Sequence, residues 1–175
     1  MTRGRTELGD VTVHNIKQLK RLNQVIFPVT YNDKFYKDLL EVCEHAKLAY
    51  FNDIVVGGVC CREFRTYGIR KLYIMTLGCL APYRRLGIGT VMLEHVLKLC
   101  EQDGQYASIF LHVQVNNESA IGFYEKFGFK IVDRKENYYK RIEPADAFVL
   151  EKDLTTDGSG VSPGEEEVEE KSVAA

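Results

Sequence analysis

Apolar residues recur at helical spacing in several parts of the chain. Ile16, Leu19, Leu22 and Ile26 lie three or four residues apart, which predicts a helix that ends at Ile26. The preceding stretch Asp10–Thr12 offers side chains that are typical of a helix start. Further helices are predicted from Asn32 or Asp33 onward, over Gly89–Asp103, and over Glu118–Lys126 with a cap at Asn116 or Asn117.

Shorter runs rich in β-branched and aromatic residues predict strands between these helices. The expected strands are Arg5–Leu8, Leu48–Phe51, Ile54–Arg62, Leu72–Leu80, Ser108–Val115, Phe129–Asp133 and Phe148–Leu154. The polar stretch Glu63–Arg70 is expected to be an exposed loop. The order β-α-α-β-β-β-α-β-α-β-β predicts an α/β fold, with a mixed α+β sheet and no internal repeat.

Composition narrows the class of protein. The chain has 175 residues, of which 45% are hydrophobic and 27% charged, as in an ordinary globular domain. No apolar run is long enough to cross a bilayer, and the polar N-terminus does not resemble a secretory signal. The five cysteines include the adjacent pair Cys60 and Cys61, which favours reduced, buried thiols in an intracellular protein. No Cys or His pair has zinc-ligand spacing, so no metal is expected.

The charge is concentrated near the C-terminus. Between Thr155 and Ala175 there are six acidic residues and one basic residue, a net charge of −5 within a total of −2. The rest of the chain is therefore mildly basic. A segment rich in Glu, Gly, Ser and Pro without aromatic residues buries too little apolar area to offset its ordering entropy. We expect a folded domain over residues 1–154 and a disordered acidic tail over residues 155–175.

A glycine-containing loop joins the predicted strand Leu72–Leu80 to the helix that follows. It contains Arg84 and Arg85 and then Gly87 and Gly89. Glycine lets backbone N–H groups approach a ligand closely, and a helix start adds unpaired N–H groups and a positive dipole end. The loop is therefore a candidate phosphate site, although neither the Walker nor the dinucleotide-binding glycine pattern is present. A tight strand–helix turn is the alternative interpretation.

Two motifs together resemble the GNAT superfamily of acetyl-CoA-dependent N-acetyltransferases. Arg84-x-x-Gly87-x-Gly89 is similar to its pyrophosphate motif, and Asn117-x-x-Ala120-x-x-x-Tyr124-x-x-x-Gly128-Phe129 is similar to its second motif. The resemblance covers residues 5–154 and implies the GNAT fold, whose central strands splay apart at the acetyl group.

The resemblance also implies a set of residues that bind acetyl-CoA. The strand backbone at Leu77–Cys79 would pair with the pantetheine arm, the loop would hold the pyrophosphate, and Tyr124 would hydrogen-bond the departing thiol. The implied set is Leu77, Gly78, Cys79, Arg84, Arg85, Leu86, Gly87, Ile88, Gly89, Thr90, Asn117, Ser119 and Tyr124. Core packing beside Phe123 and Phe127 is the other explanation of Tyr124.

Attack of an amine on a thioester requires a neutral amine and is helped by a nearby base. A peptide α-amine, with a pKa of about 8, needs less help than a lysine at about 10.4. Strand alternation places Tyr73 on one face with Met75, and His112 on the less apolar face of its own strand. We expect Tyr73 and His112 to be catalytic and to remove the amine proton through a water. A core histidine that only completes its hydrogen bonds is the alternative for His112.

Within the superfamily, the chain is similar to the N-terminal acetyltransferases of the NatE type. That resemblance implies an apolar pocket for a retained initiator methionine and hydroxyl groups that hold the peptide backbone. The implied substrate-binding residues are Phe27, Pro28, Val29, Tyr31, Met75, Tyr138, Tyr139, Lys140, Arg141 and Ile142. The chemistry agrees, because an apolar side chain favours aromatic walls and a peptide backbone favours a few placed hydroxyls.

The resemblance further implies action on protein N-termini, with subunits of the NatA complex and the ribosome as partners. The net charge of −2 gives no pull toward nucleic acid or an anionic membrane, so neither is expected as a partner. The expected location is cytoplasmic and also nuclear. Two alternatives stay open: a protein lysine (histone) acetyltransferase, with lysine or self-acetylation otherwise a lesser activity, and a non-catalytic scaffold of the same fold. A missing Tyr73, His112 or glycine loop would favour the scaffold, and all three are present.

Overall fold

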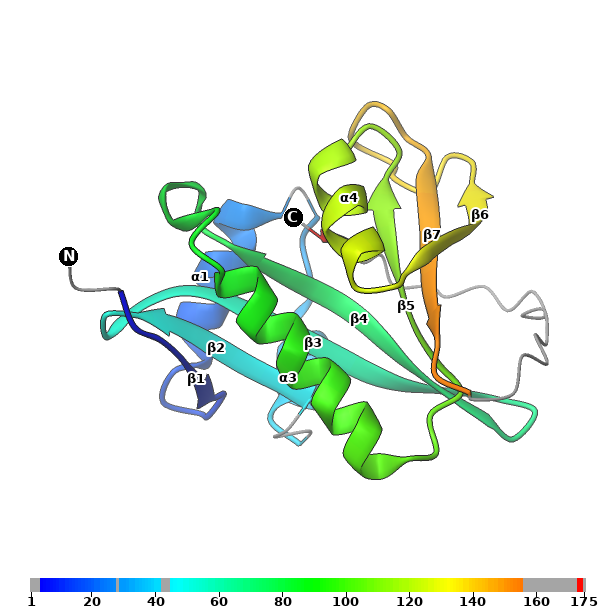
Figure 1. The fold of residues 1–175 in the computed structure, drawn as a ribbon. Coiled ribbons are helices and arrows are strands. Elements are labelled where there is room, and N and C mark those ends of the chain that lie inside the picture. The colour runs from blue at the N-terminus through cyan, green and yellow to red at the C-terminus, as the bar shows by residue number, and fades with distance from the viewer. Residues whose placement is uncertain (1–3, 28, 42–44, 156–172, 175) are drawn as a thin grey trace.

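A single mixed sheet runs through the computed structural model, which describes residues 4–27, 29–41, 45–155 and 173–174 (Figure 1). The strands follow the order β1-β2-β3-β4-β5-β7-β6 across the sheet, and β8 pairs with β4. The strands are β1 (Thr6–Asp10), β2 (Ala46–Phe51), β3 (Ile54–Thr66), β4 (Ile69–Cys79), β5 (Ser108–Gln114), β6 (Lys130–Lys135), β7 (Ala147–Asp153) and β8 (Val173–Ala174). The helices are α1 (Ile16–Ile26), α2 (Asp33–Leu39), α3 (Ile88–Asp103) and α4 (Glu118–Lys126), with a 3-10 turn, η2, at Ala81–Tyr83. The predicted α/β class and element order are confirmed.

The helices cover both faces of the sheet and create two cores. Figure 1 shows α3 and α4 on one face and α1 on the other. Met92 and Val96 of α3 and Tyr124 of α4 are buried in the first core. Leu19 of α1 and Phe35 of α2 are buried in the second, together with Tyr73 of β4. The candidate catalytic residue Tyr73 thus faces the side of the sheet that α1 and α2 cover.

Strands β4 and β5 are joined only at one end. Their parallel pairing covers three rungs, from Lys71–Ser108 to Tyr73–Phe110. Beyond Tyr73 the two strands diverge, as Figure 1 shows. From Ile74 onward the β5-facing edge of β4 is therefore open to a partner other than β5.

A β-bulge in β4 explains where the strands separate. In the β3–β4 ladder, Cys60 lies opposite Thr76 while Cys61 lies opposite Ile74, so Met75 is the extra residue. A bulge bends its strand and frees backbone groups, and bulges are common beside active sites. Met75 follows the last β4–β5 rung by two residues. The bend therefore turns β4 away from β5 at the point where an acetyl group is expected to lie.

Two expected boundaries are wrong. Glu63–Arg70 is not a loop, because β3 continues to Thr66 and β4 already begins at Ile69. The turn between them is Tyr67-Gly68, and both residues have positive φ, as the two-residue turn of a tight hairpin requires. The largely polar composition of this stretch, without a clear alternation of apolar and polar residues, gave the appearance of a loop. One edge of the hairpin is fastened to α3, since Arg70 donates to Asp103 Oδ1 at 2.9 Å and also contacts Glu63.

The start of the first helix is also later than predicted. Asp10 belongs to β1 and forms an ion pair with Lys47 of the neighbouring strand, so it caps no helix. Helix α1 begins at Ile16 after a turn in which Asn15 Oδ1 accepts from the Thr12 N–H group. The other caps agree with prediction: Asn32 accepts from Phe35 N, and Asn117 accepts from Ala120 N. None of the described helices is long and apolar enough to cross a membrane.

The expected disordered tail lies mostly outside the described residues and stays a prediction there. Two of its residues, Val173 and Ala174, form β8, whose backbone pairs in parallel with Thr76 and Leu77 of β4. The strand also lies against β5, so it fills part of the gap between the diverging strands (Figure 1). The C-terminal end of the chain thus shares Leu77 with the expected acetyl-CoA site.

Candidate active site

Tyr73 and His112 meet across the gap between β4 and β5. The Tyr73 hydroxyl lies 3.1 Å from His112 Nδ1, although the residues are 39 positions apart in the chain. Tyr138 of the loop before β7 completes the group, because its ring stacks on His112 with centroids 4.5 Å apart and its hydroxyl lies 3.5 Å from that of Tyr73. The two predicted catalytic side chains are therefore in direct contact.

Burial keeps His112 neutral. The side chain is 4% exposed, and the pKa is lowered from its usual 6.5 to about 4, first by desolvation and then by the nearby Lys135 charge. Asp133 opposes this effect on the pKa more weakly. A neutral imidazole has one nitrogen that accepts a proton. In the tautomer that carries its hydrogen on Nε2, Nδ1 accepts the hydrogen bond of the Tyr73 hydroxyl. His112 is buried as a core histidine would be, but its partner is the second candidate catalytic group.

Several of the predicted pocket residues form an apolar cluster beside this pair. Phe27 and Tyr139 are buried together with Ala147, and other predicted wall residues pack against them. These are Val29, Tyr138 and Ile142. Pro28 lies outside the described residues. Side chains from the end of α1 and from the loop before β7, far apart in the chain, thus pack into one apolar cluster.

Tyr31, one of the predicted backbone-binding residues, lies in the second core. Tyr31 is buried and donates from its hydroxyl to the backbone carbonyl of Met75 at 3.4 Å, so the bulge residue holds this ring in place. Burial raises the pKa of Tyr31 well above its usual value, which keeps the group a hydrogen-bond donor. Lys140 and Arg141 follow Tyr139 in the same loop and are exposed, so their predicted contacts with substrate stay a prediction.

The glycine loop forms the expected helix start. Gly87 precedes α3 with φ 85°, a left-handed conformation that L side chains rarely adopt, and Arg85 also has a positive φ. Arg84 and Arg85 are exposed at the start of α3, where the first N–H groups have no partner within the helix. Gly89 differs, since a Cβ atom there would meet the Phe123 ring at an ordinary 3.5 Å. The loop thus has the geometry of an anion site, and Gly87 is the position that requires glycine.

Tyr124 offers a test of whether the residues fit a bound thioester. Its side chain is 1% exposed, and its hydroxyl has no hydrogen-bond partner among the described residues. Burial raises the pKa of Tyr124, so the hydroxyl keeps its proton. An enclosed donor without a partner is costly unless a ligand supplies an acceptor. A departing sulfur would do so, and the fit with the second motif is therefore good.

The second-motif residues at the start of α4 have a structural role as well. Asn117 caps the helix through its side chain, while Ser119 is exposed in the first turn. Leu77 and Cys79 are buried in β4, and Gly78 lies so close to Phe27 that a Cβ atom would meet its ring at 3.1 Å. Gly78 therefore connects the cofactor strand to the apolar pocket.

One site residue was missed in the sequence. Phe110 stacks on Tyr73, with ring centroids 4.7 Å apart at 20°. Its signal was present, since it shares a strand face with His112, but an apolar side chain there is equally typical of a core.

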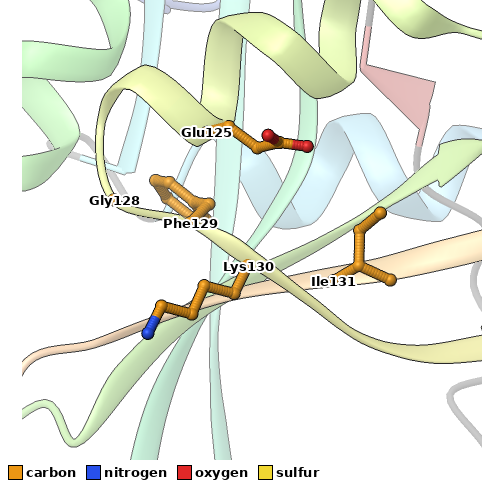
Figure 2. Close-up of a pocket in the computed structure, with 5 residues that line it drawn as sticks. All are labelled: Glu125, Gly128, Phe129, Lys130 and Ile131. Carbon is orange, nitrogen blue, oxygen red and sulfur yellow. The ribbon is translucent and has the colours of Figure 1, made fainter.

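A separate hollow of about 390 Å³ lies between the end of α4 and β6 (Figure 2). Its lining consists of Glu125, Gly128, Phe129, Lys130 and Ile131. The hollow contains no predicted site residue. The candidate catalytic groups therefore belong to the gap between β4 and β5 and not to this hollow.

Comparison with known proteins agrees with this geometry. The acetyltransferase (GNAT) family matches residues 16–129. N-alpha-acetyltransferase 50 of Danio rerio is 74% identical over 152 residues, which cover 87% of this chain and 90% of the relative. The probable N-acetyltransferase san of Drosophila melanogaster is 71% identical over 154 residues, which cover 88% of this chain and 84% of that relative.

A solved structure shares both the fold and the sequence. It is Arabidopsis thaliana Naa50 in complex with the bisubstrate analogue CoA-Ac-MVNAL, which is 51% identical with a TM-score of 0.80 and covers 85% of this chain and 99% of that one. The family match covers both motifs. The chain belongs to the GNAT family of acetyltransferases.

Proposed function

We propose that the chain transfers the acetyl group of acetyl-CoA to the α-amine of proteins that retain their initiator methionine. The observation that carries this proposal is the contact of Tyr73 with His112 beside the apolar cluster of Phe27 and Tyr139. Support comes also from the relatives, which are named N-alpha-acetyltransferases, and from the CoA-Ac-MVNAL analogue bound by Arabidopsis Naa50. That analogue begins with methionine.

Acetyl-CoA, when bound, supplies the thioester, in which the C–S bond breaks while the amine nitrogen forms a C–N bond with the carbonyl carbon. The attacking nitrogen gains positive charge and loses its proton readily, so a weak base is sufficient. The Tyr73 oxygen accepts this proton directly or through a water and passes its own hydrogen to His112 Nδ1, 3.1 Å away. Tyr124 donates a hydrogen bond to the departing sulfur. The departing thiolate takes up one proton from solvent, and His112 releases the proton that it received to solvent. The amine thus loses one proton and the thiol gains one.

The aromatic cluster explains preference for an apolar first residue. Burial of a methionine side chain against Phe27 and Tyr139 removes apolar area from water, at roughly 25 cal/mol per Å². Tyr31 and Tyr138 offer hydroxyls to the peptide backbone at the border of this cluster. An α-amine reaches the gap beside its own side chain, whereas a lysine would have to pass its whole stem between the aromatic walls. The arrangement thus favours the α-amine.

We infer that the acceptors include nascent chains at the ribosome, in company with NatA subunits, as for a NatE-type enzyme. The cytoplasm, and also the nucleus, would then be its location. Only the proposed substrate class supports this inference, because newly made protein N-termini are most abundant at the ribosome. Recovery of these subunits with the tagged chain, and loss of recovery in their absence, would test the partnership.

Two matched peptides test the activity. One begins Met-Leu with a free α-amine and no lysine, and the other has a blocked α-amine and an internal lysine. Mass measurement of the product is expected to locate the acetyl group mainly on the first peptide. The Tyr73→Phe variant is the matched control, since it keeps the ring and removes the hydroxyl, and it should bind acetyl-CoA normally with a reduced kcat. Transfer mainly to the second peptide would contradict the proposal.

A further inference from the structure

The stacked rings of Tyr73 and Phe110 are the last rung before β4 and β5 separate. In a parallel ladder, paired residues point to the same face, and Tyr73–Phe110 is the third of three rungs. The ring centroids lie 4.7 Å apart at 20°, and the edge of Phe64 from β3 supports the outer side of Phe110 at 5.8 Å. Tyr73 is completely buried, so Phe110 forms a flat wall against one side of its ring.

The first rung of this ladder is anchored by charge. Lys71 Nζ donates to Glu151 Oε1 at 2.9 Å, and Ser108 Oγ donates to the same oxygen at 2.5 Å. The two cross-strand partners of the first rung thus share one carboxylate from β7. Because both ion-pair side chains are largely buried, at 16% and 15% exposed, solvent competes weakly for them. This anchor fixes the register of the rung that carries Phe110.

Phe110 contacts both members of the proton-transfer pair. Besides stacking on Tyr73, it meets the His112 ring edge-on, with centroids 6.3 Å apart at 78°. Tyr73 and His112 are themselves edge-on at 5.5 Å. The three rings therefore form one packed group, in which Phe110 has no polar atom and cannot move a proton. Phe110 thus packs against both rings whose hydroxyl and Nδ1 atoms meet.

We propose that Phe110 is a positioning residue for acetyl transfer, which holds Tyr73 and His112 in the geometry that removes the amine proton. This inference rests on the proposed function. Well-placed general bases contribute roughly 100-fold or more to a rate, and that contribution depends on hydrogen-bond geometry. Loss of the flat wall would let the Tyr73 ring turn and would lengthen its contact with Nδ1. The acetyl-CoA loop lies on another element and would be unaffected.

The test is a double-mutant cycle on kcat with the free-α-amine Met-Leu peptide. Phe110→Leu removes the flat ring, and Tyr73→Phe removes the hydroxyl that the ring positions. We expect Phe110→Leu to lower kcat about tenfold in the parent chain and less than about twofold in the Tyr73→Phe background, since residues that act as a unit are not additive. Phe110→Tyr keeps the ring and is expected to retain kcat. Phe110→Met replaces the leucine variant if the latter does not fold.

Two controls separate positioning from general destabilisation. Ile109→Val changes the buried neighbour on the opposite strand face. This variant should have a lower Tm, but its kcat, measured at a temperature well below Tm, should equal that of the parent chain. The acetyl-CoA Kd should be unchanged in every variant. Equal kcat losses in both backgrounds, or a loss that Ile109→Val reproduces, would overturn the role of Phe110. A parent chain that acetylates only the lysine peptide would instead overturn the proposed function, so the two failures are distinguishable.

Discussion

The buried, neutral His112 predicts a specific dependence of stability on pH. Its pKa is about 4 in the folded chain against 6.5 for an unperturbed histidine. The unfolded chain therefore binds more protons between these values, and stability falls as pH decreases through this window. At 1.36 kcal/mol per pKa unit, the loss is about 3 kcal/mol between pH 7 and pH 4. Above pH 7 this contribution is fully present.

His112→Asn isolates this contribution, because asparagine retains a polar atom near the Tyr73 hydroxyl and does not titrate. Urea unfolding of both chains from pH 7 to pH 4 gives the free energy of unfolding at each pH. Acidification also protonates carboxyl groups with lowered pKa values. Hydrogen bonds from Arg70 lower the pKa of Asp103, and a hydrogen bond from the Asn137 backbone lowers the pKa of Asp146. These groups destabilise both chains equally, so their effect cancels in the comparison. The parent chain should lose about 3 kcal/mol more than the variant. If the free energy of unfolding falls equally with pH in the parent chain and in His112→Asn, the argument that burial holds His112 neutral is refuted.

Three further perturbations test other parts of the site. Gly87→Val should weaken acetyl-CoA binding at least about tenfold in calorimetry, because a β-branched residue is strained at φ 85° although the space there is open. Phe27→Ala should raise KM for Met-starting peptides while the acetyl-CoA Kd stays constant; equal changes in both would place Phe27 outside the peptide pocket. A chain ending at Thr155 should bind acetyl-CoA more tightly, because β8 pairs with Leu77, and an unchanged Kd would show that the two do not compete.

Local patterns in the sequence predicted most of the fold and the chemical types in the site. The element order follows from helical and strand periodicity, which neighbouring residues alone determine. The glycine loop and Tyr124 follow from motifs of fixed spacing. The hairpin at residues 63–70 was missed because exposed strand residues alternate less clearly in polarity, and only pairing between the strands defines it.

Tertiary structure decided how the predicted residues act together. The sequence places Tyr73 and His112 on suitable strand faces, but their 3.1 Å contact depends on the register of β4 against β5. The bulge at Met75, which opens the gap, arises from a register shift with β3 that no local pattern reveals. The role of Phe110 and the low pKa of His112 likewise depend on burial and on neighbours distant in the chain. Sequence alone therefore determined which groups and elements are available, whereas strand pairing and desolvation determined their distances and protonation, since both depend on contacts between segments far apart in the chain.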